Sequence, residues 1–442
     1  MNIKSVSVVG IGKLGAPVAA CFASCRHSVI AVDVNPEIIF LLNSGQAPVY
    51  EPGLEELIRQ NQDRILGTDD FHKAVLETQV TFILVPTPTD AQGGFSLQYV
   101  RAAGESIGDA LRNKKDYHLI VLTSTVMPGA TGSSVLPLLE ERSGKRCGVD
   151  FGLCYSPEFV ALGSVIRDFF HPDLLLIGES DPRSGRLLAE LYKQVCKNDP
   201  PIARMNFVNA ELTKLAVNTF VTTKISYANM LARICEGLPD ADVDVITAAL
   251  GLDSRIGRKY LKGAIGYGGP CFPRDNLALA SLARQLRVPA VLAEATDRAN
   301  RSEVNKLAAL VKSKLRPQGT VGILGLSYKP NTDVVEESQG LYLAQFLAAE
   351  GIPVICFDPA AIENAARQLP PSVRIGSSLT DCVTAADVIV ITTPWSDFQT
   401  LTTDMVTRDG IPRTIIDCWR ILVPDQFPPS IEYVRLGVGK LE

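Results

Sequence analysis

Short runs of apolar residues alternate with longer helical patterns along the first third of the chain. The run at residues 5–9 leads into Gly10-Ile11-Gly12-Lys13-Leu14-Gly15, and an alanine-rich helical pattern follows to about residue 26. A second apolar run, at residues 28–32, ends at Asp33. Continuous apolar runs that alternate with helices are typical of a parallel sheet covered on both faces. The pattern predicts an α/β fold that begins with a strand, a glycine turn, a helix and a second strand.

The glycine turn predicts a dinucleotide site. Its glycines permit a tight turn and let a pyrophosphate approach the start of the following helix. Asp33 lies 23 residues after Gly10, where a carboxylate accepts hydrogen bonds from a ribose diol and repels a 2′-phosphate. We therefore expect NAD rather than NADP. The expected cofactor contacts are Gly10, Ile11, Gly12, Leu14, Gly15 and Asp33.

Two further apolar runs, at residues 80–85 and 118–122, end in segments rich in threonine and proline. Ligands of an open parallel sheet bind outside the carboxyl ends of its strands. Thr87 and Thr125, which follow these runs, are therefore further candidates for cofactor contacts. Ordinary turn chemistry is the alternative for each threonine.

The middle of the chain contains a long stretch without proline or glycine, from about Asn209 to Glu236. Apolar residues recur around most of its circumference, which predicts a long helix that is buried on several sides and connects domains. Lys214 and Asn218 are four residues apart and would share one face of this helix. A solvent-facing pair is the alternative interpretation.

The last third repeats the order of the first. Residues 302–315 are expected to be helical, and a strand at 320–325 ends in a second glycine turn. Later apolar runs end at Asp358 and Asp417, and another ends in Thr392-Thr393-Pro394. The chain therefore predicts two Rossmann-like, doubly wound α/β domains, joined by a long central helix and a helical middle region. The expected boundaries are 1–200, 201–300 and 301–442.

The second glycine turn lacks a complete GxGxxG, so a second NAD is not expected there. A nucleoside diphosphate attached to a substrate fits better. Tyr328 and Lys329, which follow this turn, are candidates to stack on such a ligand and to pair with its charge.

Composition narrows the class of protein. The chain has 442 residues, of which 46% are hydrophobic and 21% charged, as in a soluble globular protein of two or three domains. A net charge of -5 argues against nucleic acid as the main partner. No apolar run is long enough to span a membrane, and the sequence enters a strand too early for a signal peptide. Ten irregularly spaced cysteines suit reduced thiols in a cytoplasm, and four scattered histidines predict no metal site.

One cysteine lies in an unusual setting, the stretch Gly266-Tyr267-Gly268-Gly269-Pro270-Cys271-Phe272-Pro273-Arg274-Asp275-Asn276. Pro273 suits the first turn of a helix, so Cys271 is expected just before the helix begins. The unpaired N–H groups and the positive dipole end at that position favour a thiolate. Asp275, four residues later, would share its site. A buried structural thiol is the alternative.

These pieces together resemble the UDP-glucose/GDP-mannose dehydrogenase family over nearly the whole chain. The specific motifs are residues 266–275, Ser156-Pro157-Glu158-Phe159, and Lys214 with Asn218. The resemblance implies oxidation of the C6 alcohol of a nucleotide sugar to a carboxylate, with two NAD and one water consumed. It implies that Cys271 is the nucleophile, that Lys214 and Asn218 stabilise an oxyanion, and that Asp275 moves protons through a water. Glu158 would be the base for hydrolysis of a thioester.

The same resemblance implies the contacts of the substrate and a partner. Arg274 would pair with the cofactor phosphates, and Arg255 would be lent by a neighbouring subunit of a homodimer formed through the central helix. The implied substrate-binding residues are Phe159, Val160, Lys214, Asn218, Arg255, Tyr260, Leu261, Gly268, Tyr328, Lys329 and Arg420.

Three positions depart from the family pattern. Leu162 replaces a polar residue, Glu336 replaces an arginine near the cofactor, and Pro270 replaces a common serine. UDP-glucose is the expected substrate, with GDP-mannose and UDP-N-acetylhexosamines as alternatives. Two other classes of protein stay open: a two-electron hydroxyacid dehydrogenase, and a nucleotide-sugar-binding protein that has lost turnover.

Overall fold

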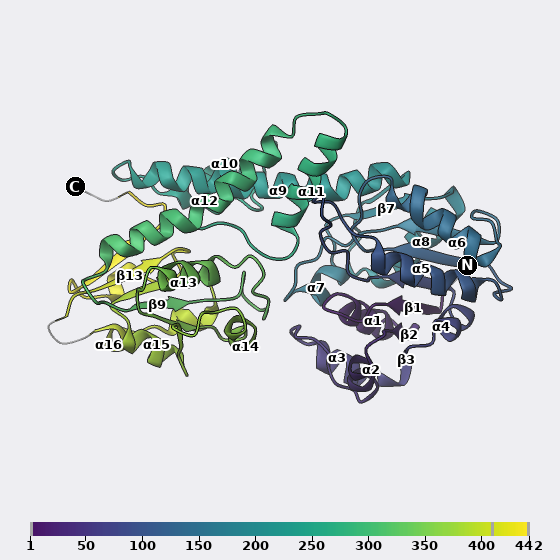
Figure 1. Cartoon of the computed structure of the whole chain (residues 1–442), viewed down its shortest axis with the longest axis horizontal. Coiled ribbons are helices and arrows are strands. Elements are labelled where there is room, and N and C mark those ends of the chain that lie inside the picture. The colour runs from purple at the N-terminus through teal and green to yellow at the C-terminus, as the bar shows by residue number, and fades with distance from the viewer. Residues whose placement is uncertain (1–2, 408–410, 440–442) are drawn as a thin grey trace. The chain divides into compact units, whose positions relative to one another are not determined.

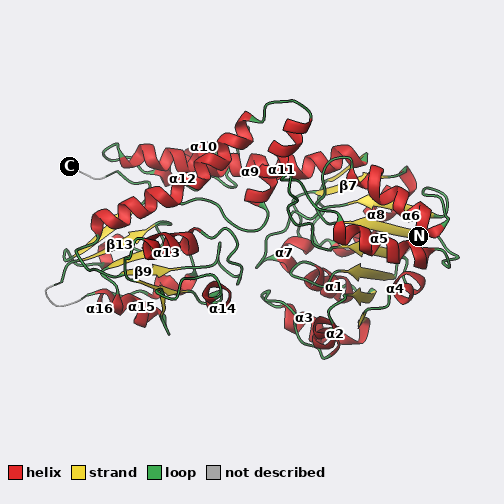
Figure 2. Ribbon diagram, viewed as in Figure 1, coloured by secondary structure: helices red, strands yellow, loops and turns green. Residues whose placement is uncertain are grey.

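The computed structural model describes residues 3–407 and 411–439 (Figure 1). The chain divides into two compact units, Met1–Ala216 and Val217–Glu442. Each unit contains one sheet bordered by helices (Figure 2). The three-part division expected from the sequence stays a prediction.

The apolar runs of the first unit form one eight-stranded sheet in the order β3-β2-β1-β4-β5-β6-β7-β8. Its neighbouring strands are parallel except β6 and β7, and β1 pairs with β2 from Ser5 opposite Ser28 to Val9 opposite Val32. The strands are β1 Ser5–Val9, β2 Ser28–Val32, β3 Ile65–Thr68, β4 Val80–Ile83, β5 His118–Leu122, β6 Phe151–Tyr155, β7 Leu175–Glu179 and β8 Ile202–Met205.

Helices cover both faces of this sheet. They are α1 Gly15–Ser24, α2 Pro36–Asn43, α3 Leu54–Gln60, α4 Phe71–Glu77, α5 Gln98–Leu111, α6 Leu136–Ser143, α7 Val165–Phe170 and α8 Pro182–Val195, with short helical turns η1 Gln62–Arg64 and η2 Thr131–Val135. Leu119 and Val121 of β5 pack with α1, α7 and α8, whereas Ile120 and Leu122 pack with α4 and α5. Because successive residues of a strand point to opposite faces, one apolar strand serves two cores.

The second unit contains a six-stranded parallel sheet in the order β11-β10-β9-β12-β13-β14. Its strands are β9 Val321–Leu324, β10 Val354–Phe357, β11 Arg374–Ile375, β12 Val388–Ile391, β13 Arg413–Asp417 and β14 Ile431–Arg435. The helices beside them are α13 Gln339–Ala349, α14 Ile362–Ala366, α15 Leu379–Ala385 and α16 Thr403–Val406, with turns η3 Ser396–Thr400 and η4 Pro424–Gln426. The predicted second doubly wound domain is thereby confirmed.

The helical middle region consists of α9 Phe207–Glu236, α10 Val243–Leu250, α11 Phe272–Gln285 and α12 Val291–Lys314. The long helix predicted from residue 209 to 236 is confirmed as α9, which starts two residues earlier. The boundary between the two units lies within it. The prediction that residues 302–315 are helical is confirmed up to Lys314, but the helix that contains them, α12, already begins at Val291. In the described part of the chain, no helix is long and apolar enough to cross a lipid bilayer.

A glycine turn of the same kind follows the strand that begins each of the two sheets. Gly10 and Gly325 both have positive φ, +92° and +110°. A side chain on Gly15 would lie 1.8 Å from the Gly10 carbonyl oxygen, and one on Gly340 would lie 2.0 Å from that of Gly325. In the second unit, residues 326–338 are inserted between the turn and α13. This insertion explains why the second turn reads as an incomplete motif.

Candidate functional site

The glycine turn of the first unit leaves room where a dinucleotide phosphate is expected. Gly10 cannot carry a side chain, because a Cβ would lie 2.7 Å from the Leu84 carbonyl oxygen. Gly12 faces open space, with no atom within 4 Å of its missing Cβ. Leu14 is the N-cap residue of α1, and Gly15 allows that helix to approach the strand. The turn therefore fits a pyrophosphate at the start of α1.

Asp33 at the end of β2 is held against this turn. Its Oδ2 accepts a hydrogen bond from the Ile11 N–H at 2.7 Å, and its Oδ1 accepts one from the Asn35 N–H at 2.9 Å. The carboxylate is only half-buried, so it remains accessible to a ribose diol. The residues of the turn and Asp33 together fit NAD.

The corresponding acid of the second unit is used differently. Asp358 is fully buried, and its Oδ2 accepts hydrogen bonds from the Leu326 and Ser327 N–H groups at 2.8 and 2.9 Å. The Trp395 indole N–H lies 3.3 Å from the same oxygen. A carboxylate enclosed in this way has no face left for a ribose, which is consistent with a ligand other than a second NAD.

The threonines after β4 and β5 are in contact with each other. The Thr87 hydroxyl donates to the Thr125 carbonyl oxygen at 2.8 Å, which joins the carboxyl ends of the two strands. The following turn is anchored by Glu211 of α9, a buried carboxylate that accepts the Gly129 and Thr131 N–H groups at 2.5 and 2.8 Å. Sequence reasoning missed Glu211, because nothing in its local pattern indicates a partner eighty residues away.

A second cluster of the first unit surrounds Glu158. The Lys214 ammonium donates to the Glu158 carbonyl oxygen at 2.6 Å and lies 4.5 Å from the centre of the Phe159 ring. Burial raises the pKa of the Glu158 carboxyl to about 7, although the nearby Lys214 lowers it. The fold thus brings together three of the residues predicted for the site, and the half-buried Val160 follows them.

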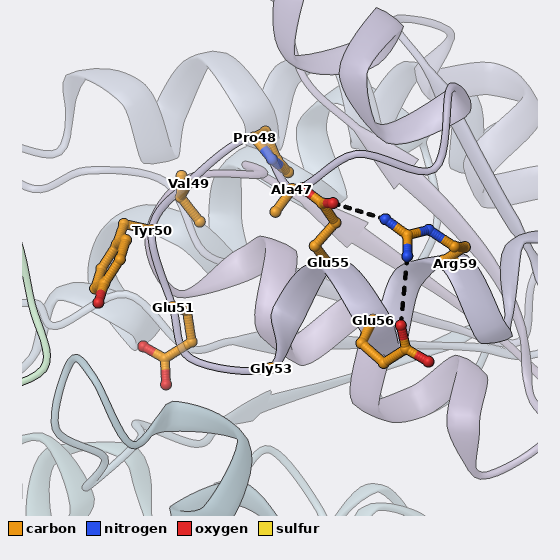
Figure 3. Close-up of a pocket in the computed structure, with 9 residues that line it drawn as sticks. All are labelled: Ala47, Pro48, Val49, Tyr50, Glu51, Gly53, Glu55, Glu56 and Arg59. Carbon is orange, nitrogen blue, oxygen red and sulfur yellow. Dashed lines mark hydrogen bonds and ion pairs between the residues drawn. The ribbon is translucent and has the colours of Figure 1, made fainter.

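The departure at Leu162 lies in a segment with its own support. Glu51 is buried, and its carboxylate accepts the Gly163 and Val165 N–H groups, both at 2.7 Å, at the start of α7. Figure 3 shows Glu51 beside a cavity of about 650 Å³ that is lined by residues between Ala47 and Arg59. Sequence reasoning missed Glu51, because its partners lie more than one hundred residues later. The segment is therefore held in place although the family's polar residue is absent.

In the second unit, Cys271 occupies the position predicted for it. It is the N-cap residue of α11, and the Asp275 N–H donates to its carbonyl oxygen at 2.8 Å. It is the one exposed cysteine among the ten, six of which are fully buried. A thiol exposed at a helix N-terminus has the environment that favours a reactive thiolate.

Asp275 lies in a buried polar cluster one turn after the cysteine. The Asn218 amide donates to its Oδ2 at 2.6 Å, and the Arg274 guanidinium lies 3.4 Å from its Oδ1. Asp275 is fully buried and Asn218 nearly so. The structure thus brings Asn218 to Asp275, a contact that the sequence did not specify. Arg274, which was expected to pair with the cofactor phosphates, lies beside the same carboxylate.

The glycine pair before the cysteine packs against the insertion 326–338. The Gly269 N–H donates to the Glu336 carbonyl oxygen at 2.9 Å. A side chain on Gly269, whose φ is +86°, would lie 2.7 Å from the Tyr328 ring, and one on Gly268 would lie 2.3 Å from the Glu337 carbonyl oxygen. Lys329 is half-buried beside that ring. The predicted nucleotide residues Tyr328 and Lys329 are therefore neighbours of the cysteine stretch.

Three other predicted substrate residues lie in the loop before the cysteine stretch. Arg255 is 86% exposed and pairs with Asp253 at 2.6 Å. Tyr260 has a positive φ of 63°, and its half-exposed ring packs edge-on against Phe272. Leu261 is buried. These positions leave Arg255 and Tyr260 accessible, as contact with a ligand or another subunit requires.

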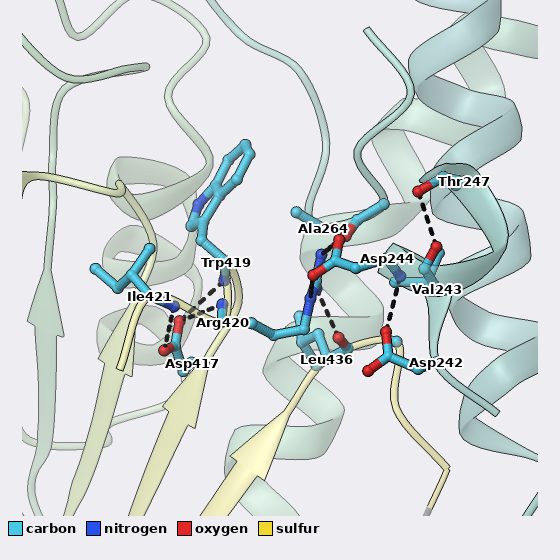
Figure 4. A network of polar contacts seen from close by, with 12 residues as sticks. Asp242, Val243, Asp244, Thr247, Ala264, Asp417, Trp419, Arg420, Ile421 and Leu436 are labelled. Atoms are coloured by element: carbon cyan, nitrogen blue, oxygen red, sulfur yellow. Dashed lines mark hydrogen bonds and ion pairs between the residues drawn. The ribbon is translucent and has the colours of Figure 1, made fainter. Parts of the chain in front are cut away.

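Arg420 is enclosed within the second unit, as Figure 4 shows. Its guanidinium donates to both oxygens of Asp244 at 2.7 and 2.9 Å, and to the carbonyl oxygens of Gly263 and Leu436 at 2.7 and 2.6 Å. Burial raises the pKa of Asp244, but the Arg420 guanidinium outweighs it and the pKa is lowered. A role of Arg420 in substrate binding stays a prediction, and the observed contacts join the loop after β13 to the segment after Leu261.

Comparisons with family models, with curated proteins and with solved structures all point to one family of dehydrogenases. Models of the NAD-binding, central and UDP-binding domains of the UDP-glucose/GDP-mannose dehydrogenase family match residues 4–196, 208–302 and 322–424. The chain is 37% identical to UDP-glucose 6-dehydrogenase AglM of Haloferax volcanii, over 90% of this chain and 92% of that protein. It is 35% identical to GDP-mannose 6-dehydrogenase of Pseudomonas aeruginosa, over 93% and 95%. A UDP-glucose dehydrogenase structure from Pyrobaculum islandicum has a TM-score of 0.89 at 34% identity, covering 99% of this chain and 98% of that one.

Proposed function

Because the chain belongs to the UDP-glucose/GDP-mannose dehydrogenase family, we propose that it oxidises the C6 hydroxymethyl group of UDP-glucose to a carboxylate, with NAD as oxidant. The observation that carries the proposal is the exposed Cys271 at the N-terminus of α11, with the buried Asn218–Asp275 pair one turn away. A carbon that loses two hydrides in succession needs a tetrahedral intermediate between the two losses. A cysteine thiolate supplies it.

The proposed reaction consists of two oxidation steps and one hydrolysis. The C6 alcohol loses a proton and a hydride and becomes an aldehyde. The Cys271 thiolate adds to the aldehyde carbon and the carbonyl oxygen takes up a proton, and the resulting thiohemiacetal loses a second hydride and a proton to give a thioester. Water then adds to the thioester carbon, the carbon–sulfur bond breaks, and two protons are released as a carboxylate and the free thiolate form. When bound, NAD supplies the acceptor for each hydride, so two NAD and one water are consumed.

Asp275 and Asn218 are proposed to serve the oxidation steps. The Asn218 amide group has two N–H donors, and one of them binds Asp275 at 2.6 Å. A buried carboxylate hydrogen-bonded in this way is fixed in position and can exchange protons through a water. Lys214 contributes a positive charge that favours an oxyanion, which develops when the sulfur adds to the carbonyl.

Glu158 is proposed as the base that activates the hydrolytic water. Its carboxyl pKa of about 7, raised by burial and countered by Lys214, lets it accept a proton near neutral pH. An ordinary carboxylate would be a much weaker base. The Lys214–Glu158 hydrogen bond fixes the segment that carries this group.

UDP-glucose is proposed as the substrate on the strength of the relatives. The Haloferax volcanii enzyme and the Pyrobaculum islandicum structure, both named for UDP-glucose, resemble this chain over nine-tenths of its length or more. GDP-mannose is the second candidate, because the Pseudomonas aeruginosa enzyme is almost equally similar.

A substrate screen tests this proposal. Purified protein and NAD are mixed with UDP-glucose, UDP-galactose, GDP-mannose and two UDP-N-acetylhexosamines, and NADH formation is followed for each. We expect the highest kcat/KM with UDP-glucose, and loss of NADH formation in Cys271→Ala. A higher kcat/KM with GDP-mannose would contradict the substrate assignment, and turnover unaffected by Cys271→Ala would favour a two-electron dehydrogenase. Binding of a nucleotide sugar without any NADH would favour a protein that has lost turnover.

We also propose that the chain forms a homodimer through α9. Phe220, Tyr227 and Ile234 recur every seven residues on this helix and are 66%, 49% and 50% exposed. A seven-residue spacing places apolar side chains on one stripe of a helix, which is the pattern of a helix that packs against another helix. Met230, 49% exposed, widens the same stripe.

A further inference from the structure

Two buried asparagines hold the backbone that leads to the cysteine stretch. Asn229 of α9 is 3% exposed. Its Oδ1 accepts the Ala264 N–H at 2.8 Å, and its Nδ2 donates to the Ile265 carbonyl oxygen at 2.9 Å. The side chain thus binds a donor and an acceptor of neighbouring residues at once.

Asn300 of α12 makes the same kind of double contact farther along. Its Oδ1 accepts the Tyr267 N–H at 2.7 Å, and its Nδ2 donates to the Tyr267 carbonyl oxygen at 2.9 Å. Asn300 is 6% exposed. It packs closely against Gly266, where a Cβ would lie 2.8 Å from Asn300 Oδ1. Residues 264–267 are not part of a sheet, so the two side-chain amides supply the hydrogen-bond partners that a neighbouring strand would otherwise give their backbone.

The hold on Tyr267 extends to the helix that carries the cysteine. The Asn276 amide of α11 donates to the Tyr267 hydroxyl at 3.3 Å and to the Phe272 carbonyl oxygen at 3.0 Å. Tyr267 is therefore tied at its backbone to α12 and at its hydroxyl to α11. Cys271 lies in the stretch between Tyr267 and Asn276, the two residues that the contact at the hydroxyl joins.

We propose that Asn229 and Asn300 are positioning residues for Cys271, which they place by clamping the backbone of residues 264–267. The proposal rests on the proposed function, in which Cys271 attacks the sugar aldehyde. A nucleophile held at the wrong place by about 1 Å loses on the order of 100-fold in rate. Loss of either clamp leaves two buried backbone groups without partners and releases the segment.

The test replaces Asn300 by leucine, which removes both hydrogen bonds, and by aspartate, which keeps the acceptor for the Tyr267 N–H. We expect Asn300→Leu to lower kcat about 100-fold, whereas the KM for UDP-glucose changes by less than about threefold. Asn300→Asp should recover part of the lost kcat. The rate of alkylation of Cys271 by iodoacetamide, followed by peptide mass spectrometry, should change in the leucine variant in the absence of any substrate.

A matched control is available in the first unit. Asn43 of α2 clamps Gly67 in the same manner, with its Nδ2 donating to the Gly67 carbonyl oxygen at 3.0 Å and its Oδ1 accepting the Gly67 N–H at 2.7 Å. Asn43→Leu should reduce thermal stability but leave kcat and the Cys271 alkylation rate unchanged. Circular dichroism at the assay temperature shows whether each variant is folded, and Asn229→Leu, which removes both hydrogen bonds of the other clamp, serves as a second clamp variant if Asn300→Leu does not fold.

Unchanged kcat and alkylation rate in a folded Asn300→Leu or Asn229→Leu would overturn the proposal and leave the clamps a purely structural role. The two proposals fail separately. If the Cys271→Ala variant forms NADH as fast as the unaltered protein, the proposed function fails, whereas the alkylation rate of Cys271 in the asparagine variants still reports whether the asparagines position the thiol.

Discussion

The proposed chemistry depends on single residues whose acidity is shifted or whose surroundings are fixed. Glu158 combines a raised pKa with a backbone tied to Lys214, and Asp275 combines full burial with a short bond from Asn218. The types and spacing of these residues are visible in the sequence. Their environments are not, because burial and hydrogen bonding depend on residues far away in the chain.

The pKa of Glu158 predicts a pH dependence. As the pH rises through about 7, the carboxyl loses its proton and becomes a base, so the hydrolysis step should accelerate across this range. Glu158→Gln should lower kcat by about 100-fold or more and accumulate a covalent adduct on Cys271. The measurements are kcat from pH 5 to 9 and the intact mass of the protein during turnover. Glu56→Gln, at an exposed position, is the control, and a Glu158→Gln protein with full kcat and no adduct would refute the role.

At the scale of elements, the pattern of apolar runs predicted both glycine turns, their strands and the long helix α9. These features follow from local sequence, since a short apolar run or a helical periodicity involves only residues that are near one another in the chain. The start of α12 was missed, and so were the contacts of Glu51, Glu211, Asn229 and Asn300. Each of these acids and amides forms hydrogen bonds with backbone groups of a distant segment, and no repeating pattern in the sequence indicates such a contact.

The contact between the glycine pair and the insertion 326–338 predicts the effect of a single methyl group. Gly269→Ala would place a Cβ 2.7 Å from the Tyr328 ring at a φ of +86°, so the ring must move. We expect a higher KM for the nucleotide sugar and a loss of about 1 kcal/mol or more in the free energy of unfolding. Gly351→Ala is the matched control, because Gly351 has a φ of +76° and no atom within 4 Å of its missing Cβ. Equal KM values in the two variants would contradict a role of Tyr328 in binding.

At the scale of the whole molecule, the chain carries an NAD-binding domain and a second domain that matches the family's UDP-binding domain. The family membership and the fold class were predictable because motifs in three separate regions agreed. The substrate was not predictable to the same degree, because Leu162, Pro270 and Glu336 depart from the family pattern and relatives named for UDP-glucose and for GDP-mannose are almost equally similar.

The exposed stripe on α9 predicts the oligomeric state. Phe220→Asp with Ile234→Asp places two charges on this stripe, and we expect the protein to change from a dimer to a monomer in sedimentation velocity experiments. Leu286→Asp, at an exposed apolar position outside α9, should leave the dimer intact. A monomer in the unaltered protein, or a dimer that survives both charges, would contradict the proposed interface.

A four-electron oxidation through Cys271 fixes the number of NADH formed for each substrate molecule, and this stoichiometry can be measured. A limiting, known amount of UDP-glucose is converted to completion with excess NAD, and the NADH formed is quantified together with the sugar-nucleotide product. We expect two NADH for each UDP-glucose consumed and a product with a carboxylate at C6. One NADH for each UDP-glucose, with an aldehyde or ketone as product, would contradict it.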